Sequence, residues 1–197
     1  MLGIATDDVL GFTEVMAKLA VTTDLSADQA AMSLAKFANI TKLSADNYDE
    51  LGSVIVALDN NFATTESSIV SMATRFASTG EIVGLTERQM MAVAAAISSV
   101  GIESEAGSSA IGKALKGIEL AVVTNSDALK DYASVAGVSA EEFSRAWGED
   151  AVAALSMFID GLNDTERNGK TAIEILDEMG ITEVRMSNAM LYLRLLA

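Results

Sequence analysis

The feature that most constrains the fold is a short motif that ends one helix and begins the next. In this motif an apolar residue precedes Ser or Thr, and acidic or amide residues follow. It occurs five times, as LSADQ from Leu25, LSADN from Leu43, LTERQ from Leu85, VSAEE from Val138 and ITEVR from Ile181. Each Ser or Thr can accept a hydrogen bond from an exposed backbone N–H of the first helical turn. The motif therefore predicts a series of short helices.

The residues around the motif strengthen this prediction. Three copies carry Gln or Glu three residues after the cap, which completes a capping box, at Gln29, Gln89 and Glu142. Three copies follow a glycine, the residue that most readily adopts the left-handed conformation at the end of a helix, at Gly84, Gly137 and Gly180. Together these residues predict two-residue hinges between consecutive helices.

Apolar residues recur with helical spacing between the hinges, and no segment of useful length alternates with a period of two. One helical stripe consists of Met90, Val93, Ile97 and Val100. A second consists of Ile111, Leu115, Ile118 and Val122. The predicted helices are 6–21, 26–41, 47–61, 65–79, 86–100, 104–123, 126–136, 139–161, 168–179 and 182–196. The predicted fold class is all-α, with about ten short helices in a compact irregular helical bundle.

Polarity rises between Val122 and Ser139, and this is the best candidate for a domain boundary. We predict two helical subdomains, 1–125 and 126–197, without excluding a single domain. The chain has no proline, although average usage would give about ten. Apolar residues make up 50% of the chain but aromatic residues only 5%. The core is therefore expected to consist of Ala, Val, Ile, Leu and Met, with helices packed closely.

The composition argues against several classes of function. Without Cys or His the chain has no thiolate ligand, no cysteine nucleophile and no Ser-His-Asp triad. Its net charge of −15 disfavours direct nucleic-acid binding, which needs a basic surface. We predict that the protein is not an enzyme. We predict no catalytic, cofactor-binding or metal-binding residues, and no cofactor.

Three motifs resemble functional sites, and a structural role explains each better. Gly169 and Lys170 end a stretch similar to a phosphate-binding loop, but the first glycine of that loop is missing. Asp59–Glu66 has the composition of a calcium loop without its ligand spacing, and we expect Thr64 or Thr65 to cap a helix there. Adjacent acidic residues such as Asp49 and Glu50 point apart on a helix, so they do not form a carboxylate pair.

The stretch from Met90 to Leu115 raises the question of a membrane segment. Its apolar run, Met90 to Ile97, is eight residues long, whereas a membrane-spanning helix needs about twenty. Small residues follow at helical spacing, as the pairs Ser108/Gly112 and Ala110/Ala114. We expect a helical hairpin that turns at Gly101 and packs its apolar faces on each other or on a second copy. The last helix, 182–196, is apolar on more than one face and should be buried or dock on a partner.

The ordered motifs of the chain resemble the core region of tail tape measure proteins from long-tailed bacteriophages and prophages. The resemblance is carried by LGSVIVALDNNFATTESSIVSMATRFASTG, then an alanine-rich helix, then GIESEAGSSA. It continues through FSRAWGEDAVAALSMFIDGLN and GKTAIEILDEMGITEVRMSNAMLYL, so it covers roughly residues 10–197. Members of that family are far longer, which implies that this chain is a fragment or a split prophage product.

The resemblance implies a structural protein of the virion. Such a protein lies in the lumen of the tail tube, governs tail length during assembly in the bacterial cytoplasm, and leaves with the DNA on infection. It implies several copies per tail, with the tail tube protein, the tail assembly chaperones and the tail tip proteins as partners. The alternative function is a membrane-active module that inserts into the host envelope during DNA ejection, so membrane contact is expected only after ejection. The family supplies no catalytic residue to transfer.

Overall fold

The computed structural model describes residues 9–22, 24, 26–164 and 171–179. These residues form helices and connecting turns, and no strand occurs among them, which confirms the all-α prediction. The helices are α1 (Val9–Thr22), α2 (Ala27–Thr41), the 3₁₀ helix η2 (Ala45–Asn47), α3 (Tyr48–Asn61), α4 (Glu66–Ile82), α5 (Glu87–Ser99), α6 (Ser104–Thr124), α7 (Asp127–Ala136), α8 (Ala140–Glu149), α9 (Ala151–Asn163) and α11 (Ala172–Glu178).

The chain divides into two compact units. Unit 1 comprises Met1–Glu81 and Thr86–Ser108, and unit 2 comprises Ile82–Leu85 and Ser109–Ala197. Helix α6 contributes residues to both units, because the division falls within it. The division into subdomains 1–125 and 126–197 stays a prediction.

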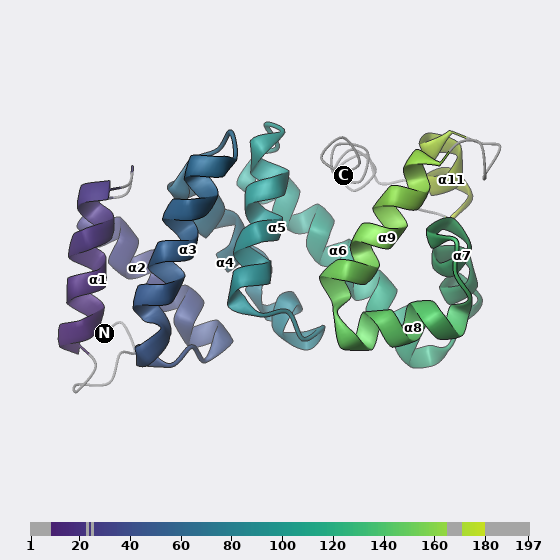
Figure 1. The fold of residues 1–197 in the computed structure, drawn as a ribbon, viewed down its shortest axis with the longest axis horizontal. Coiled ribbons are helices and arrows are strands. Elements are labelled where there is room, and N and C mark those ends of the chain that lie inside the picture. The colour runs from purple at the N-terminus through teal and green to yellow at the C-terminus, as the bar shows by residue number, and fades with distance from the viewer. Residues whose placement is uncertain (1–8, 23, 25, 165–170, 180–197) are drawn as a thin grey trace. The chain divides into compact units, whose positions relative to one another are not determined.

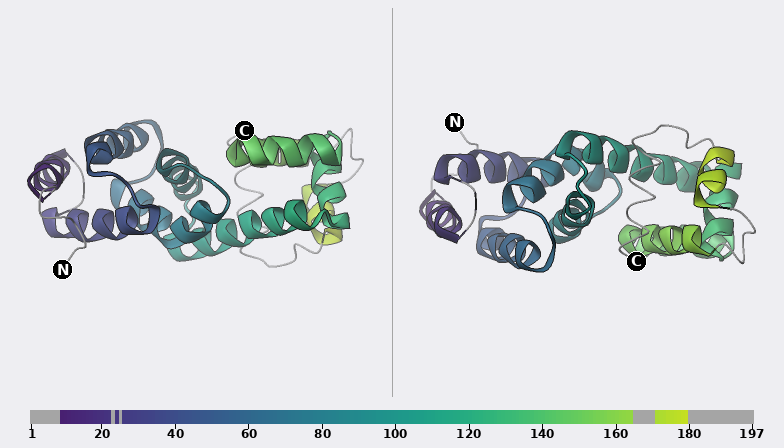
Figure 2. Two further views of the ribbon diagram at one scale, coloured as in Figure 1. Left: turned by 90° about the horizontal axis from the view of Figure 1, so that it is seen from below. Right: turned by 90° about the horizontal axis from the view of Figure 1, so that it is seen from above.

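In unit 1, helices α1, α3 and α5 lie side by side (Figure 1), with contacts from α1 to α3 and from α3 to α5. Helices α2 and α4 lie behind this row, as the turned views in Figure 2 also show. The centre of the unit is filled by fully buried side chains from several helices: Phe37, Ile55, Ile69, Met72 and Phe76. Two exposed ion pairs, Lys18–Asp49 and Arg88–Glu50, tie α3 to its neighbours. Such exposed pairs contribute little to stability, because solvent screens them.

In unit 2, helices α7, α8 and α9 each contact the other two. Tyr132 stacks on Phe143 with ring centroids 6.3 Å apart and meets Phe158 edge-on at 5.3 Å. The indole N–H of Trp147, on α8, donates a hydrogen bond of 2.7 Å to the Glu119 carboxylate of α6. Aromatic packing and this hydrogen bond therefore hold the centre of unit 2.

The predicted helix caps are largely confirmed. Capping boxes form at Ser26, Thr86 and Ser139, each with the Gln or Glu that the motif supplies. Gly84 and Gly137 have φ angles of +77° and +75°, in the left-handed region expected at helix ends. A fourth box, which the motif does not predict, forms at α11, where the Thr171 hydroxyl accepts from the Glu174 N–H and the Glu174 carboxylate accepts from the Thr171 N–H. The motif at Ile181, Gly180 and the predicted helix 182–196 lie outside the described residues.

The prediction of one helix over 139–161 is wrong, because Asp150 divides it into α8 and α9. The Asp150 backbone is extended, with φ −154° and ψ 99°. Its carboxylate accepts hydrogen bonds from the N–H groups of Val152 and Ala153, at 3.0 and 3.1 Å. A short acidic side chain can thus satisfy a new helix start and compete with helix continuation.

The structure also corrects the prediction for Ser44, which does not cap an α-helix. The 3₁₀ turn η2 follows it, with the Asn47 N–H donating to the Ser44 carbonyl at 3.0 Å. Helix α3 begins after Asn47, whose side chain makes no capping bond. The same sequence motif therefore begins either kind of helix, and the residues that follow decide which.

Helix α4 begins with a cap from a distant part of the chain. Asp24, between α1 and α2, accepts hydrogen bonds from the backbone N–H of Ser67 at 3.0 Å and from its hydroxyl at 2.6 Å. Burial alone would raise the pKa of Asp24, but the hydrogen bonds from Ser67 and Thr65 outweigh it and lower the pKa. The charged carboxylate therefore holds the segment before α2 against the start of α4.

We predict that Asp24→Asn lowers the free energy of unfolding by about 1 kcal/mol at pH 7, since it removes a charged helix cap. Because the folded pKa of Asp24 lies below its unfolded value, the stabilisation is present above the unfolded pKa. It is lost as the pH falls through the folded pKa. Urea unfolding at pH 7 and at about pH 3 should show the variant and wild type converging at acid pH. Asp46→Asn, at an exposed aspartate of η2, is the matched control. An equal loss at both pH values would contradict the assignment.

Gly161 lets α9 lie directly on the backbone of α7. A Cβ atom at this position would be 2.6 Å from the carbonyl carbon of Val135 and nearer still to its oxygen. Backbone atoms cannot move aside as the end of a flexible side chain can, so the two helices would have to separate.

We predict that Gly161→Ala lowers the free energy of unfolding of unit 2 by about 2–3 kcal/mol through overpacking. Gly148→Ala is the control, because a Cβ on this exposed glycine of α8 meets nothing within 4 Å. That change should be neutral or stabilising by up to about 1 kcal/mol, since alanine favours the helix. Urea unfolding followed by the fluorescence of Trp147 measures both variants. A Gly161→Ala protein as stable as Gly148→Ala would refute the close packing.

Candidate interaction surface

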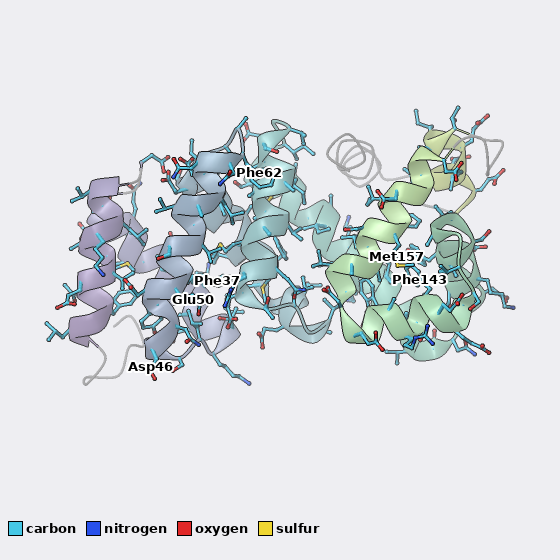
Figure 3. All side chains as sticks on the ribbon, viewed as in Figure 1. Phe37, Asp46, Glu50, Phe62, Phe143 and Met157 are labelled. Carbon is cyan, nitrogen blue, oxygen red and sulfur yellow. The ribbon has the colours of Figure 1, made fainter. Side chains whose placement is uncertain are left out.

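The adjacent acidic residues Asp49 and Glu50 have structural roles. Asp49 pairs with Lys18 at 2.8 Å, whereas the adjacent Glu50 pairs with Arg88 on a different helix (Figure 3 labels Glu50). The two carboxylates thus diverge, as predicted. Across the part of the chain that the structure describes, no three acidic side chains gather in an arrangement that could hold a metal ion.

The segment Asp59–Glu66 also consists of helix ends. The side-chain amides of Asn60 and Asn61 donate to backbone carbonyls one turn earlier in α3, at 2.8 and 2.7 Å. Thr65 caps α4 and accepts from the Ser68 N–H at 3.3 Å, as predicted for Thr64 or Thr65. Gly169 and Lys170, which resemble part of a phosphate-binding loop, lie outside the described residues.

The turn at Gly101 is confirmed, since α5 ends at Ser99, α6 begins at Ser104, and Gly101 has φ +80°. Ile97 is fully buried, and a Cβ on Gly107 of α6 would lie 2.8 Å from its Cγ2 atom. The first turns of α6 therefore pack closely on α5. Packing on a second copy stays a prediction.

Most of the small residues that follow in α6 are buried. Ser108, Ala110 and Ala114 are all at least nine-tenths buried. Gly112, the fourth member of the predicted pairs, is half-buried. In unit 2 the remainder of this face is apolar and closed to solvent, through Ile111, Leu115 and Ile118.

The opposite side of α6 carries a different chemistry, which we call the α6 outer stripe. It consists of Lys113, Lys116, Leu120 and Val123, all of them exposed and all in unit 2. Their spacings of three, four and three residues place them on one helix face. Leu120 and Val123 are large aliphatic residues with 62% and 70% of their surface exposed.

The α6 outer stripe was not identified from the sequence. The sequence nevertheless contains it, because the four positions recur with helical spacing between the residues of the apolar stripe, Ile111, Leu115 and Ile118. Helical periodicity predicted the covered stripe correctly, but it does not show that Leu120 and Val123, which are also aliphatic, stay exposed. The remaining exposed large aliphatic residues in the described ranges are Leu10, Val21, Met32, Ile82 and Ile173.

The stripe combines lysines and aliphatic residues on a chain with 28 acidic and 13 basic residues. The stripe is therefore a basic and partly apolar surface on an acidic chain. Within the described residues, no helix is both long enough and apolar enough to cross a bilayer.

Comparison with known proteins identifies the family. A family model described as phage-related minor tail protein matches residues 1–190. No curated protein and no solved structure matches the chain. The family match includes nearly all of the sequence, and with it both units of the fold. The chain therefore belongs to the family of phage-related minor tail proteins.

Proposed function

We propose that the chain is a folded segment of a tail tape measure protein, with a structural and non-catalytic role. Membership of the minor tail protein family supports a place in the phage tail. The finer assignment rests on the ordered motifs from Ala38 to Leu115, which resemble the core region of tape measure proteins. In this role the parent protein governs tail length during assembly and leaves with the DNA on infection.

One structural observation supports a particular task for this segment. A molecular ruler needs an extended element with a constant rise per residue, such as one long helix. Here capping boxes and left-handed glycines interrupt the helices repeatedly, and the chain folds back into compact units. We propose that this segment is an assembly or docking domain, and that the part that measures length lies elsewhere in the parent chain.

The proposed location is the lumen of the tail tube, after assembly in the bacterial cytoplasm. The proposed partners are other copies of the chain, the tail tube protein, the tail assembly chaperones and the tail tip proteins. We propose no direct binding of nucleic acid, since a net charge of −15 repels phosphates. Leakage of dye from phospholipid vesicles on addition of the chain would instead favour the alternative, a membrane-active module.

The α6 outer stripe is the proposed contact with an acidic, partly apolar surface of a tail protein. Leu120 and Val123 would supply the buried area, and Lys113 and Lys116 would orient the partner. Because Leu120 and Val123 are exposed in the isolated chain, we expect changes at these two residues to leave the fold intact.

We predict that in-frame deletion of this segment from its parent phage gene abolishes tail assembly or leaves tail length nearly unchanged. As one extended helix, its 197 residues would instead span roughly 300 Å, at about 1.5 Å per residue. Electron microscopy of the tails measures the difference. Intact tails shorter by roughly 300 Å would show that the segment is part of the ruler and would contradict the docking role.

We predict that the double change Leu120→Ser and Val123→Ser leaves the free energy of unfolding within about 0.5 kcal/mol of wild type, since both residues are exposed. In the phage it should reduce the yield of complete tails. Leu115→Ser, at a fully buried position of the same helix, is the contrasting variant and should cost about 3 kcal/mol or more. A normal yield of tails with the double variant would rule out the stripe as a contact.

A further inference from the structure

The two units differ in the polar groups that they bury. Among the described residues, the buried polar or charged ones are Thr41, Glu66, Thr74 and Ser108, and all four belong to unit 1. The described part of unit 2 buries apolar and aromatic side chains. We infer that unit 1 opens before unit 2, so that the fold contains a fixed order of unfolding.

Thr41 is the clearest weak point of unit 1. It is the last residue of α2 and only 6% exposed, and its hydroxyl oxygen has no hydrogen-bond partner. The other buried hydroxyls of this unit are satisfied, because Thr74 donates to the Val70 carbonyl at 2.7 Å and Ser108 to the Glu105 carbonyl at 3.1 Å. A buried hydroxyl without a partner keeps the full cost of its desolvation.

Glu66 lies at the start of α4 and is also enclosed, with only 4% of its surface exposed. Unlike the Thr41 hydroxyl, its carboxylate is not among the buried groups without a partner. The next residue, Ser67, is the one that Asp24 caps. The beginning of α4 therefore relies on a contact with Asp24, 43 residues away, in addition to the local cap from Thr65.

The close contacts of the two units also differ in stiffness. In unit 1, Gly80 lies under the thioether of Met90, where a Cβ would be 2.7 Å from the sulfur atom. Gly107 lies against the end of Met72 and against Ile97. Methionine side chains adjust easily, so the contact at Gly80 resists sliding only weakly. In unit 2, Gly161 instead meets the backbone of α7, beside the aromatic cluster of Tyr132, Phe143 and Phe158.

We infer the order of opening from the fold alone. The role of this order in the phage rests on the proposed function. A protein that must leave a narrow tube has to give up its compact form. Opening of unit 1 first would release α1 to α5 while α7 to α9 stay folded.

The single tryptophan makes this order measurable, because Trp147 reports on unit 2. A second protein, carrying Trp147→Phe and Tyr48→Trp, reports on unit 1, since Tyr48 lies in α3 at the edge of its core. We expect the unit 1 reporter to unfold at a urea concentration lower by about 0.5 M or more. Far-UV circular dichroism of the wild type reports on the helices of both units. With increasing urea, this signal should begin to change before the Trp147 fluorescence does.

Thr41→Val tests the cause, because it removes the unsatisfied hydroxyl and keeps the shape of the side chain. It should move the unit 1 midpoint upward by about 0.5 M urea and leave the Trp147 midpoint unchanged. Thr74→Val is the matched control, since it removes a buried hydroxyl that is already hydrogen-bonded, and it should give no increase.

Coincident transitions from both reporters and from circular dichroism would overturn the inference, as would earlier unfolding of unit 2. If the reporter protein fails to fold, hydrogen exchange of the wild type replaces it. Backbone amides of α2 and α4 should then exchange faster than those of α8 and α9, and the reverse order would overturn the inference. These measurements use the isolated chain, so their failure is separate from any result on tail length.

Discussion

The need to satisfy the backbone at every helix start is the constraint on which the rest of the structure depends. The first turn of each helix exposes N–H groups that must find acceptors. Capping boxes supply them at Ser26, Thr86, Ser139 and Thr171, and carboxylates supply them at Asp150 and, from a distance, at Asp24. Each cap fixes where a helix begins, and so where the chain reverses.

These reversals connect the fold to its place in the phage tail. A chain with so many helix ends cannot run as one rod, so it buries its apolar stripes within compact units. What remains at the surface is strongly acidic, apart from local features such as the α6 outer stripe. The docking role that we propose for this segment of a minor tail protein rests on these compact, acidic, helical units.

Most helix boundaries could be predicted because their signals are local. Ser139 and Glu142 are three residues apart, and Gly137 ends the preceding helix whatever surrounds it. The helix cap at Asp150 was not predicted, because the repeated motif has only Ser or Thr at its cap position. Aspartate caps a helix equally well. The cap that Asp24 gives to α4 could not be predicted, because nothing in either segment specifies a partner so distant in sequence.

The sequence by itself determined the all-α class, the hinges and the likeness to tail proteins, since each depends on residues close together in the chain. Only the tertiary structure decided that Leu120 and Val123, two aliphatic residues of α6, are left to solvent. The tertiary structure also leaves the buried Thr41 hydroxyl without a hydrogen-bond partner and encloses Glu66. The physical reason is that burial depends on side chains brought in from several helices, whereas a helix cap is completed within one turn.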